Sequence, residues 1–421
     1  MKLPIRLSVV IVVLITCFCT SRMANAQGVL LRSIGATNAA VGGTATAMPI
    51  DAAGALQWNP GSISAFKKNE MSFGLELIQA HSRVESSLPA LYGGHSGSTK
   101  GEVGVVPAPS MAFIWSTSPR SPFTYGLGMS AIGGAASLYP HDADNPVLGG
   151  FSPLGEHGRS ANVIVLQVTP TVSAQLTERL SVGVAPIVDL ASLNINPMSL
   201  GRDHANPLMT YGTKYVWGGG FQIGALYDFK NHFKTGFMFK SPIWAEKLYF
   251  TGTDSEGIPD SNTFHLNLPM TLSAGISYDG IRNTIIGMDV RYFDYGNTKG
   301  FEKGVVAGKV EGLDWESIFS VNVGLERKIN NRIKGRLGYC WNENPIPSRS
   351  TYANISAPMI SQHVFSCGVG YTFTKDIEAS VAYCHAFEVK STGEIPLGIP
   401  GSSVTNTLSA DSFFAGLTKK W

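Results

Sequence analysis

Few residue clusters in this 421-residue chain have the types and spacing that enzyme chemistry requires. Asp203 and His204 are adjacent and have the chemistry of half an acid/base pair, while His141, Asp142 and Asp144 carry side chains that bind metal ions. Adjacent Asp–His pairs are common in solvated loops, and the sequence holds no Gly-x-Ser-x-Gly elbow, phosphate-binding glycine loop or zinc-binding Cys pair. We therefore predict no catalytic residue, no metal site and no cofactor.

The first 26 residues have the pattern of a cleaved export signal. Lys2 and Arg6 form a basic start, residues 7–19 are almost entirely apolar, and Ala24-Asn25-Ala26 offers a small-x-small cleavage site. The sequence therefore predicts a signal peptide over residues 1–26 and a mature chain that begins at Gln27.

The composition of the remaining chain excludes two further classes. No stretch after Gln27 approaches the run of about 20 apolar residues that a membrane-spanning helix needs, although 44% of the chain is hydrophobic and 15% is charged. The net charge of +2 comes without a basic stripe, which argues against binding to nucleic acid.

From Asn69 onward, apolar side chains alternate with small or polar ones in segments of about ten residues, the period of a strand with two different faces. Met71, Phe73, Leu75 and Leu77 share one such face. We count about fourteen predicted strands: 69–81, 109–118, 123–134, 161–174, 179–195, 215–228, 233–247, 264–278, 283–296, 315–327, 332–342, 363–374, 376–388 and 411–421.

The connections between these segments alternate between tight turns and stretches of about twenty residues or more rich in Gly, Pro, Ser and Asn. An outer-membrane β-barrel has this plan, with short periplasmic turns, long outer loops and an even number of strands. Charge is scarce on the apolar faces, and Lys334 and Arg336 fall on the opposite face of their strand. Aromatic residues near strand ends are candidates for the two interface girdles: Trp115, Tyr125, Trp217, Tyr227, Tyr339, Trp341 and Tyr371. The fold class is therefore all-β, a transmembrane antiparallel barrel over residues 67–421.

The segment before the barrel, residues 27–66, does not alternate, yet it is too rich in small and apolar residues for a disordered tail. A barrel of about fourteen strands has a lumen wide enough for water, and a segment of this size fits inside it. Residues 35–43 suit tight packing, and Asp51 stands where it would cap a short helix that continues to Ala55. We therefore expect this segment to fill the lumen.

Several motifs across the mature chain resemble the FadL-type outer-membrane transporters of long-chain fatty acids and aromatic hydrocarbons. They are residues 35–64 with Ala39, Gly42-Gly43, Asp51-Ala52-Ala53 and Asn59-Pro60, then Leu266-Asn267-Leu268-Pro269, Asn344-Pro345-Ile346-Pro347, Gly370-Tyr371-Thr372-Phe373, and Ala382-Tyr383 before His385. The resemblance implies an N-terminal hatch inside a fourteen-stranded barrel, with hatch residues at Gly42, Gly43, Asp51, Asn59 and Pro60.

The resemblance also implies passive uptake of a hydrophobic ligand, released sideways into the membrane beside a kinked third strand. The matching strand here carries Gly133 and Gly134, and glycine weakens ladder pairing and permits a bulge, so we predict a lateral opening there. The alternative is that these glycines only relieve crowding in the barrel wall.

Two departures from the family pattern bear on the ligand. Asn59-Pro60 is followed by Gly61 where the family has alanine, a change that we expect to loosen the backbone. No Lys or Arg follows Arg179 through Pro197, where family members can place a basic residue for the fatty-acid carboxylate, so Lys299 and Lys303 become the candidate substitutes.

The expected partners are therefore a long-chain fatty acid or another hydrophobic ligand, together with outer-membrane lipid, and we expect a monomer. A general diffusion porin, a barrel enzyme and a loop-displaying adhesion protein remain as alternatives.

Overall fold

The computed structural model describes residues 27–118, 121–149, 158–200, 202, 206–254, 256–302, 304–306, 309–396 and 398–421. The predicted signal peptide lies outside the described residues, as do Asp203, His204 and Lys303. None of the helices in the described ranges has the length and apolar character that crossing a membrane would need.

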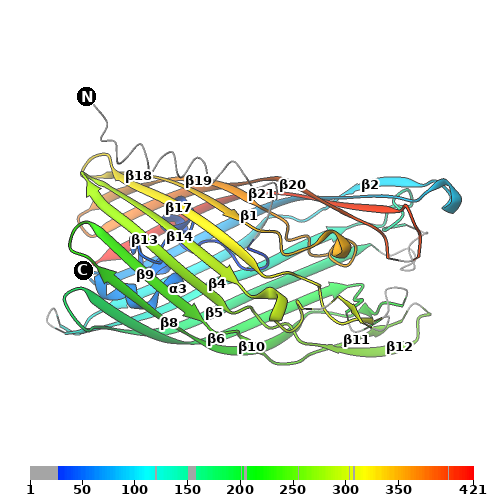
Figure 1. Ribbon diagram of the computed structural model, residues 1–421, viewed down its shortest axis with the longest axis horizontal. Coiled ribbons are helices and arrows are strands. Elements are labelled where there is room, and N and C mark those ends of the chain that lie inside the picture. Colours follow the sequence, from blue (N-terminus) through cyan, green and yellow to red (C-terminus); the bar gives the residue numbers. More distant parts are fainter. Residues whose placement is uncertain are drawn as a thin grey trace.

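Fourteen antiparallel strands of the described residues close into one barrel, which confirms the predicted fold class (Figure 1). Each strand pairs with the next one along the chain, and the last pairs with the first. They are β1 (Glu70–Ser87), β3 (Val106–Trp115), β4 (Phe123–Tyr139), β5 (Arg159–Gln175), β6 (Leu180–Asn196), β8 (Lys214–Asp228), β9 (Phe233–Lys240), β13 (Thr271–Ile281), β14 (Thr284–Phe293), β17 (Ile318–Lys328), β18 (Ile333–Asn342), β19 (His363–Thr374), β20 (Ile377–Gly393) and β21 (Ser403–Lys420).

The two faces of each strand meet different surroundings because side chains alternate across a sheet. Along β1, Phe73, Leu75 and Leu77 are exposed on the outside of the barrel, whereas Glu76 is buried inside. Near the short-turn end of the barrel, Trp115 stacks on Tyr125 at 5.9 Å between ring centroids, as expected of an interface girdle. Apolar side chains outside and polar side chains inside are the arrangement that lipid requires.

Strand ends differ from prediction mainly at the long-loop end of the barrel. β20 continues to Gly393 and β21 already begins at Ser403, so most of the predicted loop between them is strand. The predicted strand 264–278 begins only at Thr271, because Pro269 cannot donate to a ladder. Before it, Leu268 makes only a single bridge to Ile243.

The long loops carry the smaller elements, and β2, β11 and β12 lie at the end of the barrel away from the C-terminus (Figure 1). β2 (Ser96–Lys100) extends the pairing of β1, and β10 (Trp244–Ala245) pairs with β8. The others are η2 (Ala90–Tyr92), β7 (Met209–Thr210), β11 (Leu248–Thr253), β12 (Pro259–Phe264), η3 (Tyr295–Asn297), β15 (Val305–Val306), β16 (Lys309–Val310) and η4 (Ser348–Ser350).

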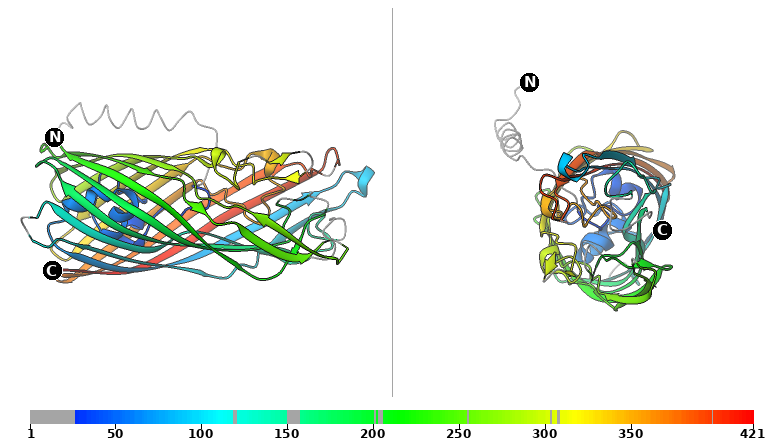
Figure 2. Two further views of the ribbon diagram at one scale, coloured as in Figure 1. Left: turned by 90° about the horizontal axis from the view of Figure 1, so that it is seen from below. Right: turned by 90° about the vertical axis from the view of Figure 1, so that its right-hand side faces the viewer.

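Residues 27–66, the lumenal segment from here on, lie inside the ring of strands (Figure 2). The segment contains α2 (Gly35–Ala40), α3 (Ala52–Trp58) and η1 (Pro60–Ala65), and most of its side chains are buried. Its helices lie in the half of the barrel near the short-turn end, beside the C-terminus (Figure 1). The site built by the segment and the wall therefore lies within the barrel.

Candidate functional site

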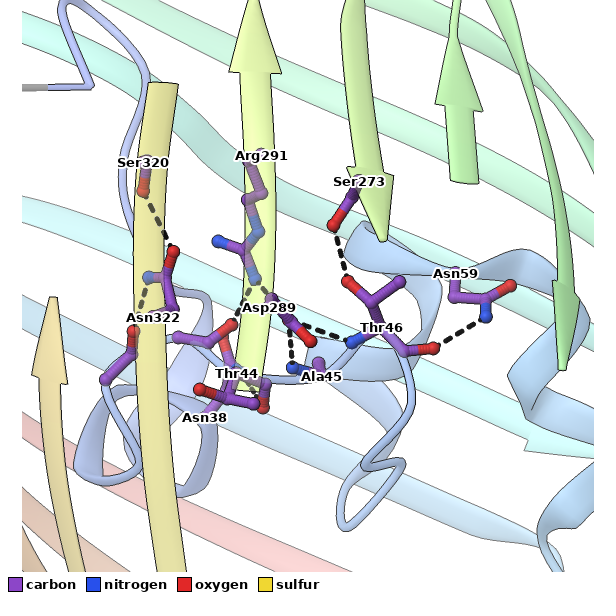
Figure 3. A network of polar contacts seen from close by, with 12 residues as sticks. Asn38, Thr44, Ala45, Thr46, Asn59, Ser273, Asp289, Arg291, Ser320 and Asn322 are labelled. Carbon is purple, nitrogen blue, oxygen red and sulfur yellow. Dashed lines mark hydrogen bonds and ion pairs between the residues drawn. The ribbon is translucent and has the colours of Figure 1, made fainter. Parts of the chain in front are cut away.

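The lumenal segment is bound to the wall by buried polar side chains of β14 and β17 (Figure 3). The Asp289 carboxylate accepts hydrogen bonds from the backbone N–H groups of Ala45 and Thr46, at 2.9 and 3.0 Å, and from the Arg291 guanidinium at 3.0 Å. Arg291 in turn donates to the carbonyl of Gly43, and its side chain is fully buried. One ion pair thus fixes three residues of the segment, Gly43, Ala45 and Thr46, because buried charges need such partners.

Two asparagines complete this network. Asn322 on β17 donates to the Gly42 carbonyl at 2.6 Å (Figure 3). Asn59 donates to the Thr46 carbonyl at 2.7 Å and to the Ala225 carbonyl of β8 at 2.9 Å, so one side chain joins two parts of the segment to the wall. Asn59 also caps η1 by accepting from the Gly61 N–H at 2.9 Å.

Glycines allow the segment and the wall to meet backbone to backbone. Gly42 has a φ of +68°, and a Cβ atom there would lie 2.8 Å from the backbone nitrogen of Tyr339. Facing it, a Cβ atom on Gly338 of β18 would lie 2.0 Å from the nitrogen of Gly42. A larger residue at either position would force the lumenal segment away from the wall.

The same holds where the family's alanine is replaced by Gly61. A Cβ atom there would lie 2.6 Å from the carbonyl oxygen of Gly224 on β8. Gly61 therefore permits close packing against the wall, a role that our expectation of a looser backbone did not include.

Asp51 stands at the start of α3 as the sequence predicts. Its side chain accepts from the Gly54 N–H at 3.2 Å, and the Ala52 N–H donates to Glu70 at the start of β1 at 2.8 Å. Asp51 lies outside the membrane-spanning strands, and burial, with a smaller effect of the Glu70 charge, raises its pKa from 3.8 to about 7.

Inward-facing charges on the neighbouring strands pair with one another. Arg336 forms ion pairs of 2.7 Å with Glu326 and with Glu378, and Lys334 reaches Glu378 at 2.6 Å. The predicted inward placement of Lys334 and Arg336 is therefore confirmed.

The barrel wall has a gap in its pairing between β3 and β4. These strands pair only from Ser110–Ser130 to Trp115–Tyr125. Nearer the long-loop end, the backbone N–H of Glu102 donates to the Leu138 carbonyl at 2.8 Å. Between these points, residues 103–109 face residues 131–137 with no ladder in these two fully described ranges. We call this gap the window.

Strand chemistry explains why the ladder stops. Pro107 and Pro109 lack an N–H, yet β3 still pairs with β1 through both positions, so their missing donors affect the side that faces β4. On β4 the register with β5 shifts between Ala131 and Gly133, which marks a bulge at Ile132.

The start of the lumenal segment covers the inner side of the window. The Leu31 N–H donates to the Ile132 carbonyl at 2.8 Å, and the Gly134 N–H donates to the Val29 carbonyl at 3.1 Å. Residues 29–31 thus use the edge of β4 that β3 leaves free. A Cβ atom on Gly133 would lie 3.0 Å from the Val29 carbonyl oxygen, so this approach favours glycine.

A cavity of about 140 Å³ lies where residues 27–32 meet the window. Its lining combines inward-facing side chains with outward-facing ones, so it reaches both sides of the wall. Arg32 and Glu76 are the ionisable residues of the lining. Most of the other lining side chains are apolar, among them Ile78, Pro107, Ala108, Val163, Ile164 and Leu408. An engineered cavity of about 150 Å³ in another protein is large enough to bind benzene.

Other predicted residues lie elsewhere. Lys299 has an exposed side chain in an outer loop, where its carbonyl accepts from the Asn267 N–H at 3.1 Å, and it does not line this cavity. Lys303 lies outside the described residues, so its role stays a prediction. In the part of the chain that the structure describes, no three His, Cys, Asp or Glu side chains gather as metal ligands would.

Sequence reasoning missed Asp289, Arg291 and Asn322, which bind the lumenal segment, and Arg32, Glu76, Pro107 and Pro109 at the window. The two prolines carried a signal, since prolines at alternate positions of one strand point to an edge without a ladder partner. Arg32 and Glu76 carried none, because their meeting depends on how the segment lies in the lumen.

Comparison with known proteins identifies the family. The profile described as outer membrane protein transport protein (OMPP1/FadL/TodX) matches residues 15–416. No protein of curated description matches the chain in sequence.

Solved structures share the fold at low sequence identity. The Pseudomonas putida toluene transporter TodX has a TM-score of 0.71 at 16% identity, a Pseudomonas aeruginosa FadL homologue 0.73 at 13%, and the Ralstonia pickettii toluene transporter TbuX 0.66 at 16%. Each comparison covers 93% of this chain and 99% of the other. The profile match over most of the sequence shows that the chain belongs to the outer membrane protein transport protein family (OMPP1/FadL/TodX) and resides in the bacterial outer membrane.

Proposed function

We propose that this protein takes up small hydrophobic molecules passively, through the lumen cavity and then sideways through the window into the membrane. The observation that carries the proposal is the gap between β3 and β4, with a cavity that is lined from both faces of the wall. Residues such as Ala108 and Ile164 give the path an apolar lining.

The driving force needs no external fuel. Each methylene that leaves water contributes about 0.8 kcal/mol, so a short alkyl chain or an aromatic ring supplies enough free energy for capture. Release into the membrane keeps that apolar surface out of water, so the ligand does not have to return to an aqueous phase.

We further propose that the lumenal segment is a hatch, in which Gly42, Gly43, Asp51, Asn59 and Pro60 hold the closed position. The buried hydrogen bonds that Asp289 accepts from Ala45 and that Asn59 donates to Thr46 support this role. Residues 29–31 would have to leave the edge of β4 for a ligand to pass, and the two backbone hydrogen bonds to Ile132 and Gly134 would then break. Gly133 and Gly134 then form one border of the lateral opening.

Two related structures support the substrate class by name, as transporters of toluene. For this chain we propose hydrocarbons and fatty acids as the test compounds, a monomer as the working unit, and removal of residues 1–26 on export.

The uptake experiment compares cells that lack the protein with cells that express it, using labelled toluene and labelled oleate. We expect faster uptake of at least one compound in expressing cells. Equal rates for both compounds, with the protein present in the outer membrane, would refute the proposal.

A diffusion porin is the competing function. If the protein were a porin, expressing cells would take up a small hydrophilic solute such as labelled glucose faster than cells that lack it. A hydrophobic-uptake protein with its lumenal segment in place should leave that rate unchanged.

A further inference from the structure

A groove of about 730 Å³ crosses the outer surface of the wall from β17 to β21. Strand pairing aligns its outward side chains in two rows, the first of which contains Arg327, Gly335 and Val369. The second row contains Leu325, Leu337, Cys367, Tyr383 and Phe413. Gly335 and Cys367 are smaller than their neighbours in these rows, so the surface is hollowed there.

Charge reaches the groove at one end. Two arginines line it, and Arg336 is buried in ion pairs with Glu326 and Glu378. Arg327 is exposed and stands next to the last residue of β17, at the short-turn end of the barrel. Phe413, at the other end of the groove, lies farther from the end of its own strand. The groove therefore rises from the short-turn end toward the middle of the apolar wall.

The length of the groove suits one lipid chain. Neighbouring strands are about 4.8 Å apart, so the path from β17 to β21 measures about 19 Å. The apolar depth of one leaflet is about 15 Å, half of the hydrocarbon core. An extended acyl chain of one leaflet can therefore lie along the groove, with its headgroup at the short-turn end.

Exposed cations without carboxylate partners gather at that end. Arg282 lies in the turn after β13, and Lys328 and Arg332 lie with Arg327 around the turn between β17 and β18. The two turns are neighbours, because the Lys328 N–H donates to the Asn283 carbonyl at 2.8 Å.

The carboxylates of the same strands are already paired. Asp279 on β13 forms an ion pair with Lys234, and Glu326 on β17 forms one with Arg336. Among the described residues, no carboxylate lies within 4 Å of the four cations, so their charge is available to an anion from outside the protein.

We propose that this groove binds one anionic phospholipid of the periplasmic leaflet, with its phosphate at Arg327 and one acyl chain along the two rows. The short-turn end is the periplasmic end in an outer-membrane barrel. A guanidinium fork matches the geometry of a phosphate, and the neighbouring cations add attraction for a negative headgroup.

The headgroup and the chain contribute differently. A chain that leaves the bulk lipid for the groove exchanges one apolar environment for another, so it gains packing contacts and little hydrophobic free energy. The hollow therefore determines where the lipid lies, and the cations determine which lipid is preferred.

The experiment equilibrates the purified protein with equal amounts of dioleoyl phosphatidylglycerol and dioleoyl phosphatidylcholine in mixed micelles. Native mass spectrometry then counts each lipid that stays bound. The two probes share their chains and differ in net headgroup charge. We expect phosphatidylglycerol to be retained preferentially, and Arg327→Gln to lower that preference about 5-fold, the effect of one basic residue at an anionic headgroup.

Cys367→Trp tests the hollow, because its larger side chain fills the floor between Leu337 and Tyr383. It should lower the retention of both lipids several-fold. Val188→Trp is its matched control, since Val188 is exposed on the outer face of β6 and does not line the groove.

Arg179→Gln is the matched control for the headgroup, because Arg179 is an exposed arginine of another turn at the short-turn end. It should leave the preference as it is. Equal retention of the two lipids by the unaltered protein, or an equal loss of preference in Arg179→Gln, would overturn the proposal. A mass of two protein chains in place of bound lipid would also overturn it and would assign the groove to a second copy of this chain. None of these results bears on uptake, which labelled toluene and oleate measure separately.

Discussion

A single carboxylate, Asp289, holds two consecutive amides of the lumenal segment and balances the charge of Arg291. Replacing it with alanine leaves the buried Arg291 guanidinium without a counter-charge, and breaking such a pair costs about 3–5 kcal/mol. We therefore expect Asp289→Ala to release residues 44–46 from the wall. Hydrogen–deuterium exchange followed by mass spectrometry should show faster exchange at these amides.

Asp279→Ala is the control for that change, because Asp279 also forms an ion pair, with Lys234, but lies exposed near the end of β13 at the short-turn end. It should leave exchange at residues 44–46 as it is. Protection of these amides that survives in Asp289→Ala would contradict the assigned role of the ion pair.

Asp51 makes the stability of the lumenal segment depend on pH. Its pKa is about 7 in the folded protein against 3.8 for the free group, so the folded state favours the protonated form. The resulting stabilisation is complete below about pH 4 and is lost as the pH rises through 7. In the variant Asp51→Asn, the amide side chain stays neutral at every pH and still caps α3.

The comparison uses thermal unfolding of both proteins at pH 5 and pH 8. Relative to Asp51→Asn, the unaltered protein should lose about 2–3 kcal/mol over this interval, since one pKa unit corresponds to about 1.4 kcal/mol. Parallel pH profiles for the two proteins would show that Asp51 does not titrate in this range.

Single residues differ in how far the sequence predicts them. Asp51 could be assigned because its capping partner Gly54 is close in sequence, whereas Asn59 was assigned through the family resemblance alone. Asp289, Arg32 and Glu76 could not, because the residues that surround them in the barrel come from distant parts of the chain. Only the closed barrel brings β14 to within hydrogen-bond distance of Ala45.

At the scale of elements, the window depends on the two prolines of β3. Pro107→Thr combined with Pro109→Thr restores two N–H groups and places a residue of high β propensity at each position. We expect the β3–β4 ladder to lengthen, exchange protection to rise at residues 131–137, and uptake of the transported compound to fall several-fold.

Pro186→Thr tests whether any proline of the wall has this effect. Pro186 lies on β6, where pairing with β8 runs through it to Phe221. It should change neither exchange at residues 131–137 nor uptake. A double variant of β3 that transports at the full rate would show that ligands leave by another path.

The order and number of barrel strands followed from the alternation of side chains, because lipid outside and a polar lumen inside give each strand two distinct faces. The pattern weakened where strands leave the membrane. Residues 403–410 of β21 carry only two larger apolar side chains, Val404 and Leu408, and both are buried, so no alternation with an apolar outer face marked them as strand. Pairing with β1 and β20 forms the strand there.

At the scale of the whole molecule, we predict that the lumenal segment determines whether the barrel is a pore. A ring of fourteen strands encloses a lumen wide enough for water. In this protein the buried helices α2 and α3 occupy that lumen near the short-turn end. The wall faces them with polar side chains, such as Asn322 and Gln222, that water would otherwise solvate.

Removing residues 27–64 should therefore turn a closed barrel into a conducting one. In planar bilayers we expect little ion conductance from the unaltered protein and large, steady conductance from the deletion, because water and ions then reach the polar inner wall. Asp289→Ala keeps the segment in the chain, and we expect its conductance to switch on and off as the segment leaves the wall. The test therefore does not depend on whether the deletion variant folds. Closed channels in both variants would mean that the loops at the long-loop end, and not the lumenal segment, seal the barrel.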